Sequence, residues 1–178
     1  MDNSGLDRVE FDAFVASRGA ALLRLCYVLT GARAEAEDLL QEALARCYTR
    51  WSRISDLAGV EAYVRRVIVT QHASAGRRRR FRLLDTSYPV AESRLAVADA
   101  ADEVVSRETL RLALQRLPPR QRIVTVLTYY ADLPDGEIAT EMDCSVNTVK
   151  SHRAKALKAL RLVLPVTVTT DPGDRHVG

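Results

Sequence analysis

The sequence predicts an all-α protein of two small helical domains joined by a flexible linker, with a helix-turn-helix in the C-terminal domain. Its 178 residues are 47% hydrophobic but only 6% aromatic, and this balance, rich in Ala, Leu and Arg, is typical of helical proteins. Apolar residues recur at helical spacing, and the one alternating stretch, 166–169, is too short to found a sheet. The periodicity fades between residues 83 and 101, which predicts the linker.

Three amphipathic helices are expected before the linker, within residues 8–82. The first repeats apolar residues up to Leu29, and Gly31 then supplies a C-terminal stop. The second runs to Trp51, and the third runs into Gly76 and a run of arginines. Short connections between three such helices predict a compact bundle.

The second domain is expected over residues 102–164. A helix with leucines on one side stops at Pro118-Pro119, and another ends near Tyr130, ahead of the helix-turn-helix. The remaining residues, 165–178, contain Thr, Pro and Gly, and they are expected to form a disordered tail.

The helix-turn-helix over residues 134–164 is the most informative stretch. Its first helix breaks at Asp143, where such turns usually place Gly because the residue adopts a positive φ. Its second helix begins at Ser145, a good N-cap, and Val149 anchors it where the small Ala139 permits a close crossing. Basic residues fill the rest of that helix, which suits entry into the major groove of DNA. A solvated basic face on an ordinary helical hairpin is the alternative.

Charge is distributed in blocks, although the formal net charge is only +3. Acidic residues gather on the second helix, whereas residues 77–80 are four arginines. Separate blocks of opposite sign indicate two kinds of partner surface. Asp38, Gln41 and Glu42 lie at i, i+3 and i+4 and therefore share one helix face. This face is either solvated or an interface with a basic partner.

The cysteines and histidines form no catalytic or metal-binding pattern. The three cysteines, Cys26, Cys47 and Cys144, are an odd number without close spacing. Cys26 and Cys47 lie on apolar helix faces, so we expect them to be buried free thiols. The three histidines are scattered, so we expect no metal, no cofactor and no enzyme activity. No signal core is visible, and no stretch is expected to span a bilayer, which predicts a cytoplasmic protein without membrane contact of its own.

The order of these parts resembles the extracytoplasmic-function (ECF) sigma factors of the sigma-70 superfamily, and within them an actinobacterial, SigE-like subgroup. Five motifs carry the resemblance: Tyr27–Gly31 leading to Ala36–Ala43, then Ala62–Val69, Leu117–Arg122, Tyr129-Tyr130 and Thr148–Ser151. It implies a region 2 domain at 8–82 and a region 4 domain at 102–164. It further implies an alternative sigma factor that binds core RNA polymerase, recognises the −10 and −35 elements of promoter DNA and initiates transcription. An anti-sigma factor is allowed as a further partner.

The resemblance also assigns residues to these roles. Core polymerase binding falls to Asp38, Gln41 and Glu42. The −10 element and its melting fall to Arg66, Thr70 and Ser74, with Arg77, Arg78, Arg79 and Arg80 on phosphates. The −35 element falls to Thr148, Lys150, Ser151, His152, Arg153, Ala154 and Lys155, of which Thr148 and Arg153 hold phosphates while Lys150, Ser151, Ala154 and Lys155 read bases.

Three positions of the third helix depart from the family's pattern. Thr70 stands where Asn is usual, and the bulky aromatics frequent near Ala75 and Gly76 are absent. These departures bear on the −10 preference and imply weaker unaided melting of the promoter. The alternative function is a polymerase-independent helix-turn-helix regulator whose N-terminal bundle serves as a dimerisation or sensor module. The promoter-melting motif and the acidic face argue against that alternative.

Overall fold

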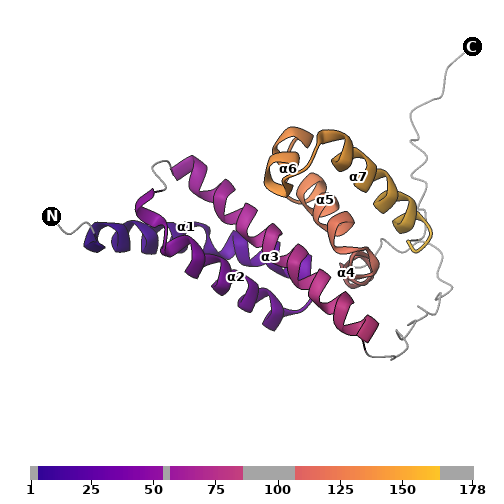
Figure 1. The fold of residues 1–178 in the computed structure, drawn as a ribbon, viewed down its shortest axis with the longest axis horizontal. Helices are drawn as coiled ribbons and strands as arrows, with labels where there is room; N and C mark the ends of the chain where they lie inside the picture. The colour runs from indigo at the N-terminus through magenta and orange to yellow at the C-terminus, as the bar shows by residue number, and fades with distance from the viewer. Residues whose placement is uncertain (1–3, 54–56, 86–106, 165–178) are drawn as a thin grey trace, which may run out of the picture.

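A computed structural model describes residues 4–53, 57–85 and 107–164 (Figure 1). Within these ranges the regular elements are all helical, and they follow one another as α1 (Ser4–Thr30), α2 (Arg33–Tyr48), the 3₁₀ turn η1 (Trp51–Arg53), α3 (Leu57–Asp85), α4 (Arg107–Arg116), α5 (Pro119–Tyr129), α6 (Asp135–Met142) and α7 (Val146–Arg161). The predicted all-α fold with a C-terminal helix-turn-helix is therefore confirmed. The predicted tail 165–178, and the predicted linker beyond residue 85, lie outside the described residues.

Helices α1, α2 and α3 pack together as the predicted three-helix bundle (Figure 1). The thiols of Cys26 and Cys47 are fully buried in its core, as predicted. Burial raises the pKa of Cys26 to about 12 and that of Cys47 to about 11, so neither thiol is reactive. Gly31 ends α1 with a φ of 77°, which only glycine adopts without strain. Trp51 closes one end of the core with an edge-on contact to Phe11, their ring centroids 5.0 Å apart.

One expectation about α1 was wrong. No stretch was expected to span a bilayer, but the segment Asp7–Thr30 is long and apolar enough, by length and composition alone, to cross a membrane, with a mean hydropathy of 1.3. The reason is that Arg18 and Arg24 are the only charged residues between Asp12 and Thr30. In the fold α1 packs in the bundle with Leu22, Leu25 and Leu29 buried in the core, and Arg18 forms an ion pair with Glu61 of α3 at 3.3 Å.

Helices α6 and α7 form the helix-turn-helix. Asp143 ends α6 in the left-handed region, with φ 50° and ψ 58°, as its position in the turn predicts. Ser145 caps α7, since its Oγ accepts a hydrogen bond from the backbone N–H of Thr148 at 3.2 Å. Val149 is completely buried and Ala139 is 7% exposed, so both take the predicted places where α6 and α7 cross.

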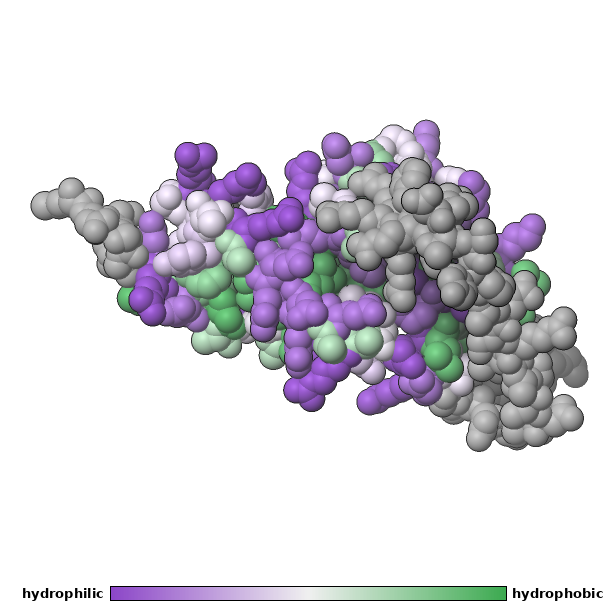
Figure 2. Space-filling model, turned by 60° about the horizontal axis from the view of Figure 1, so that its bottom comes forward, coloured by the Kyte–Doolittle hydropathy of each residue, from purple (hydrophilic) through white to green (hydrophobic). Residues whose placement is uncertain are grey.

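The N-terminal and C-terminal halves share one hydrophobic core. Ile68 and Val69 of α3 belong to the same buried cluster as Ile123 and Leu127 of α5. Side chains of the C-terminal half also reach the end of α1, where Arg122 Nη1 donates to the carbonyl of Leu29 at 2.8 Å. The domain boundaries remain a prediction, but the two halves of the described chain lie in contact. Hydrophilic side chains cover much of the face shown in Figure 2, with smaller hydrophobic areas between them.

Candidate nucleic-acid interface

Helix α7 presents one continuous outward face. The four residues predicted to read bases, Lys150, Ser151, Ala154 and Lys155, are all exposed. Two further exposed residues, Asn147 and Lys158, extend this face in both directions. With 3.6 residues per turn, the spacing i, i+4, i+7 and i+11 places four of these side chains in one stripe, Asn147, Ser151, Ala154 and Lys158. We call these four residues the outer stripe.

The start of α7 is neutral, whereas the rest of its surface is positive. Helices α2, α4 and α6 each carry an acidic residue in the first turn, but α7 carries none, and its last turn holds Lys158 and Arg161. A carboxylate in the first turn would interact favourably with the positive end of the helix dipole, but it would repel the phosphates of DNA. The first residue, Val146, is 38% exposed instead. The first turn of α7 itself therefore holds no carboxylate that would oppose the approach of phosphates.

Arg153 does not point outward with the outer stripe. Its Nη2 lies 3.1 Å from Oδ2 of Asp135 at the start of α6, and its Nη1 pairs with the other carboxylate oxygen. The hydrogen bond from Arg153 holds the pKa of Asp135 below its usual value. Arg153 follows Val149 by four residues and precedes Ala156 by three, and both are buried, so helical spacing turns it toward α6. It joins the two helices of the motif.

Thr148 and His152 are half-buried. The hydroxyl of Thr148 lies 2.9 Å from Oγ of Ser145, within the capping turn. Burial is the main cause that lowers the pKa of His152, and the charges of Arg120 and Lys155 lower it further. These causes favour the neutral form of the imidazole.

The predicted ridge on α3 is partly open to solvent. Arg66 and Thr70 are exposed and Ser74 is half-buried. The adjacent Arg65 turns the other way, and its Nε lies 2.9 Å from Oε1 of Glu141 in α6. Residues 77–80 belong to α3, but their side chains lie outside the described part of the structure.

Gly76 lies against the first turn of α5. A Cβ atom at this position would lie 2.5 Å from Cγ of Pro119. No side chain larger than hydrogen fits there in this arrangement, which gives a physical reason for the missing aromatic side chain near the end of the ridge.

Two buried ionisable groups lie where the halves meet. Burial raises the pKa of Glu141, and the nearby Arg65 guanidinium opposes the rise. Burial, together with the positive charge of Arg122, lowers the pKa of His72 to about 4. Desolvation is the largest cause of both shifts, so both side chains lie where the contact between the halves shields them from water.

The acidic face of α2 is accessible. Asp38, Gln41 and Glu42 are all exposed, on the side of α2 opposite its buried residues Ala36 and Ala43. The structure therefore brings these three predicted residues together on one surface, away from the outer stripe of α7.

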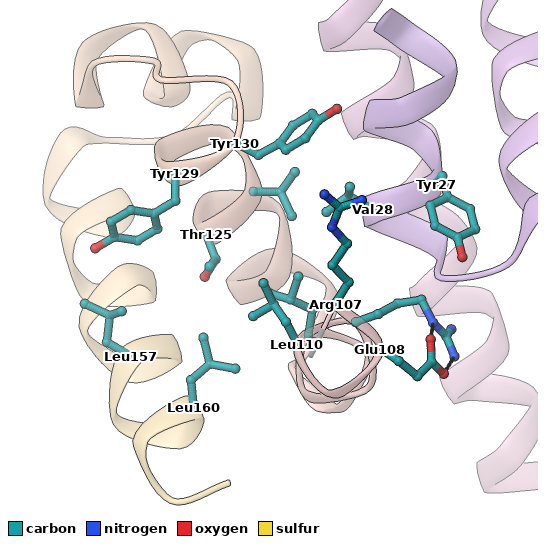
Figure 3. Close-up of a pocket in the computed structure, with 13 residues that line it drawn as sticks. Tyr27, Val28, Arg107, Glu108, Leu110, Thr125, Tyr129, Tyr130, Leu157 and Leu160 are labelled. Carbon is teal, nitrogen blue, oxygen red and sulfur yellow. Dashed lines mark hydrogen bonds and ion pairs between the residues drawn. The ribbon is translucent and has the colours of Figure 1, made fainter. Parts of the chain in front are cut away.

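A pocket of about 770 Å³ opens between α1, α4, α5 and α7 (Figure 3). Apolar side chains line most of it, with Leu157 and Leu160 on α7, and Tyr27 on α1. Tyr129, the last residue of α5, and Tyr130, which follows it, are 60% and 47% exposed and stand at the border of the pocket. Sequence reasoning missed this pocket because it forms only where both halves meet.

Comparison with known proteins identifies the family. Sigma-70 region 2 matches residues 14–82, and the model of Sigma-70, region 4 matches residues 107–160. The RNA polymerase sigma-E factor of Streptomyces coelicolor is 37% identical over 153 residues, which is 86% of this chain and 85% of that protein. The ECF RNA polymerase sigma factor SigL of Mycobacterium tuberculosis is 31% identical over 150 residues, 82% of this chain and 83% of that protein.

A solved structure shares the fold. It is the sigma factor RpoE in complex with the anti-sigma factor NepR from Bartonella quintana, with a TM-score of 0.70 at 22% identity. The match covers 89% of this chain and 98% of that one.

Proposed function

The chain belongs to the extracytoplasmic-function sigma factors of the sigma-70 family, and we propose from this premise which of its surfaces bind polymerase and promoter DNA. It is an alternative sigma factor, a transcription initiation factor that binds core RNA polymerase and promoter DNA. The polymerase-independent regulator is not favoured. We further propose that the chain acts in the cytoplasm, that catalysis belongs to the polymerase, and that an anti-sigma factor is a possible regulator.

The acidic face of α2 is the proposed polymerase-binding surface. Its support is the common exposure of Asp38, Gln41 and Glu42 on one side of a helix whose other side is core. Carboxylates on a rigid helix complement a basic partner surface, and such complementarity sets partner choice and association rate.

The outer stripe of α7 and its flanking lysines are the proposed −35 surface. The observation that carries this proposal is the exposure of Lys150, Ser151, Ala154 and Lys155 together on the second helix of a helix-turn-helix. A lysine donates to guanine O6 and N7, and an alanine methyl contacts the methyl group of thymine. The resemblance assigns Thr148 and Arg153 to phosphates and His152 to the same DNA-binding set. We propose instead that these three residues support the helix, because all are half-buried and Arg153 pairs with Asp135.

The ridge on α3 is the proposed −10 surface. Arg66 and Thr70 are accessible for unstacked bases, and Ser74 continues the line. Arg77, Arg78, Arg79 and Arg80 follow on the same helix, and we propose that they bind backbone phosphates, which position DNA without specifying its sequence.

Promoter binding should require the two halves to part. The −10 and −35 elements lie at separate places along the promoter duplex, so a chain that binds both must span the DNA between them. In this structure α3 touches α6 through Arg65 and Glu141, 2.9 Å apart, and α6 leads directly into α7. The two DNA-binding surfaces are therefore too close for both elements, and we propose that polymerase binding separates them at the predicted linker.

Run-off transcription with purified core polymerase tests the function. The chain and core together should produce a transcript that neither produces alone. Asp38→Arg should abolish co-purification with core, while the helical content stays unchanged because exposed substitutions usually alter stability by no more than about 0.5 kcal/mol.

Asp12→Arg, a charge reversal at an exposed position of α1, is the matched control and should keep polymerase binding. Undiminished binding by Asp38→Arg would refute the α2 assignment. A specific footprint on promoter DNA without polymerase would instead favour the polymerase-independent regulator.

A further inference from the structure

We propose that Asn147 reads sequence at the −35 element and selects an adenine. The inference rests on the proposed −35 function of α7 and adds a residue that the resemblance does not assign. It concerns one base pair at the end of the element that faces the start of α7.

The position of Asn147 is suited to base contact. It is the second residue of α7 and heads the outer stripe, one turn before Ser151 and two turns before Ala154. Residues at the N-terminal end of a recognition helix contact base edges when the helix enters the major groove. The left-handed turn at Asp143 and the cap at Ser145 fix where this helix begins, so the place of Asn147 is defined by the backbone.

The chemistry of the side chain points to adenine. An amide presents an acceptor oxygen and a donor NH₂ side by side. Adenine offers the complementary pair in the major groove, the N7 acceptor and the N6 amino donor, and Asn binds both together. Within the described part of the chain no intramolecular hydrogen bond to the Asn147 side chain is formed, so both groups can bind a base.

A capping or structural role does not account for Asn147. The cap is already supplied by Ser145, whose Oγ accepts from Thr148. Asn is a poorer helix former than Ala, and the side chain is exposed, so it contributes neither helix propensity nor core packing. The absence of an acid from the first turn of α7 leaves the short amide free of a neighbouring carboxylate that would compete for its NH₂.

Selection from randomised duplexes tests the proposal. The holoenzyme of core polymerase with the wild-type chain, Asn147→Ala or Asn147→Asp would each select −35 sequences. The wild type should prefer adenine at one terminal position of the element, and Asn147→Ala should lose that preference by roughly 5- to 150-fold while keeping the others. Asn147→Asp should move the preference toward cytosine, whose amino group donates to a carboxylate. A merely structural residue would not produce that change.

A base analogue provides a second test of the adenine contact. Replacing the selected adenine by 7-deazaadenine removes the N7 acceptor alone. The wild-type holoenzyme should then bind more weakly, and Asn147→Ala should not respond. Lys158→Ala, which removes a positive charge at the far end of the outer stripe, should weaken binding to all sequences alike and keep its response to the analogue.

The outcomes separate the two proposals. If the holoenzyme selects no −35 sequence, the function proposed for α7 fails. If it selects an element but the wild type and Asn147→Ala share the same preferences, or if Asn147→Ala weakens matched and unmatched sequences equally, the assignment of Asn147 is overturned. Thermal melting of each variant confirms that it is folded before selection.

Discussion

Replacing Gly76 by Ala is expected to destabilise the chain, although Gly→Ala in a helix normally stabilises it. A Cβ at this position would lie 2.5 Å from Cγ and 3.1 Å from Cβ of Pro119. The proline ring is rigid and begins α5, so it cannot swing aside. Overpacking of this kind costs about 1–3 kcal/mol, whereas the change contributes about 1 kcal/mol to the helix. The net effect is a loss of up to about 2 kcal/mol in the free energy of unfolding.

Gly19→Ala in α1 is the matched control. Its Cβ would meet only Cγ1 of Val15, at an ordinary 3.5 Å, so it should stabilise the chain by about 0.5–1 kcal/mol. Urea unfolding of the full chain measures both, and the difference between the variants reports the clash between α3 and α5. Small-angle scattering detects the other possible response, a separation of the halves. If Gly76→Ala stabilises as much as Gly19→Ala and the radius of gyration is unchanged, the contact between the halves does not form in solution.

Three further predictions follow from the ionisable groups. Asp135→Arg or Arg153→Asp alone should reduce the ratio of binding to matched over scrambled −35 sequences, and the double exchange should restore part of that ratio. If the double exchange restores nothing, or if Arg153→Asp lowers the slope of log affinity against log salt concentration by about one, Arg153 is a phosphate contact. Burial raises the pKa of Glu141 in the folded chain. Between the pKa of the unfolded state, about 4.5, and that of the folded state, the folded chain therefore binds more protons than the unfolded chain. The stability that this group contributes should therefore be present in acid and be lost as pH rises through the folded pKa, and urea midpoints should show that Glu141→Gln lacks this dependence. Iodoacetamide should modify the half-buried Cys144 before Cys26, whose pKa is about 12; rapid labelling of Cys26 in the native chain would contradict its burial.

Local signals predicted the helix-turn-helix well because its geometry is encoded within a few residues. The left-handed residue Asp143 and the cap Ser145 follow from backbone and hydrogen-bonding preferences that do not depend on distant contacts. The burial of Val149 follows from helical period alone. The same period turns Arg153 toward α6, where it pairs with Asp135, whereas the resemblance assigns Arg153 to a phosphate; that assignment stays a prediction.

Contacts between the halves could not be read from periodicity. Gly76 looks like a helix stop or a missing aromatic until Pro119 is placed against it. Glu141 occupies an apparently ordinary surface position of α6 and is buried only because α3 lies beside it. Such features depend on packing between segments far apart in the chain, for which one sequence carries no local signal.

The side chains that cap the end of α1 have a thermodynamic consequence for transcription. Arg122 and Gln115 donate to the carbonyl of Leu29, and Arg111 donates to that of Gly31. If only the separated form binds polymerase at a promoter, its apparent affinity equals the intrinsic affinity multiplied by the fraction of molecules that are separated. Every ~1.4 kcal/mol held in these contacts then weakens that affinity about tenfold. The concentration at which this sigma factor occupies core polymerase is thus set partly by residues that contact neither polymerase nor DNA.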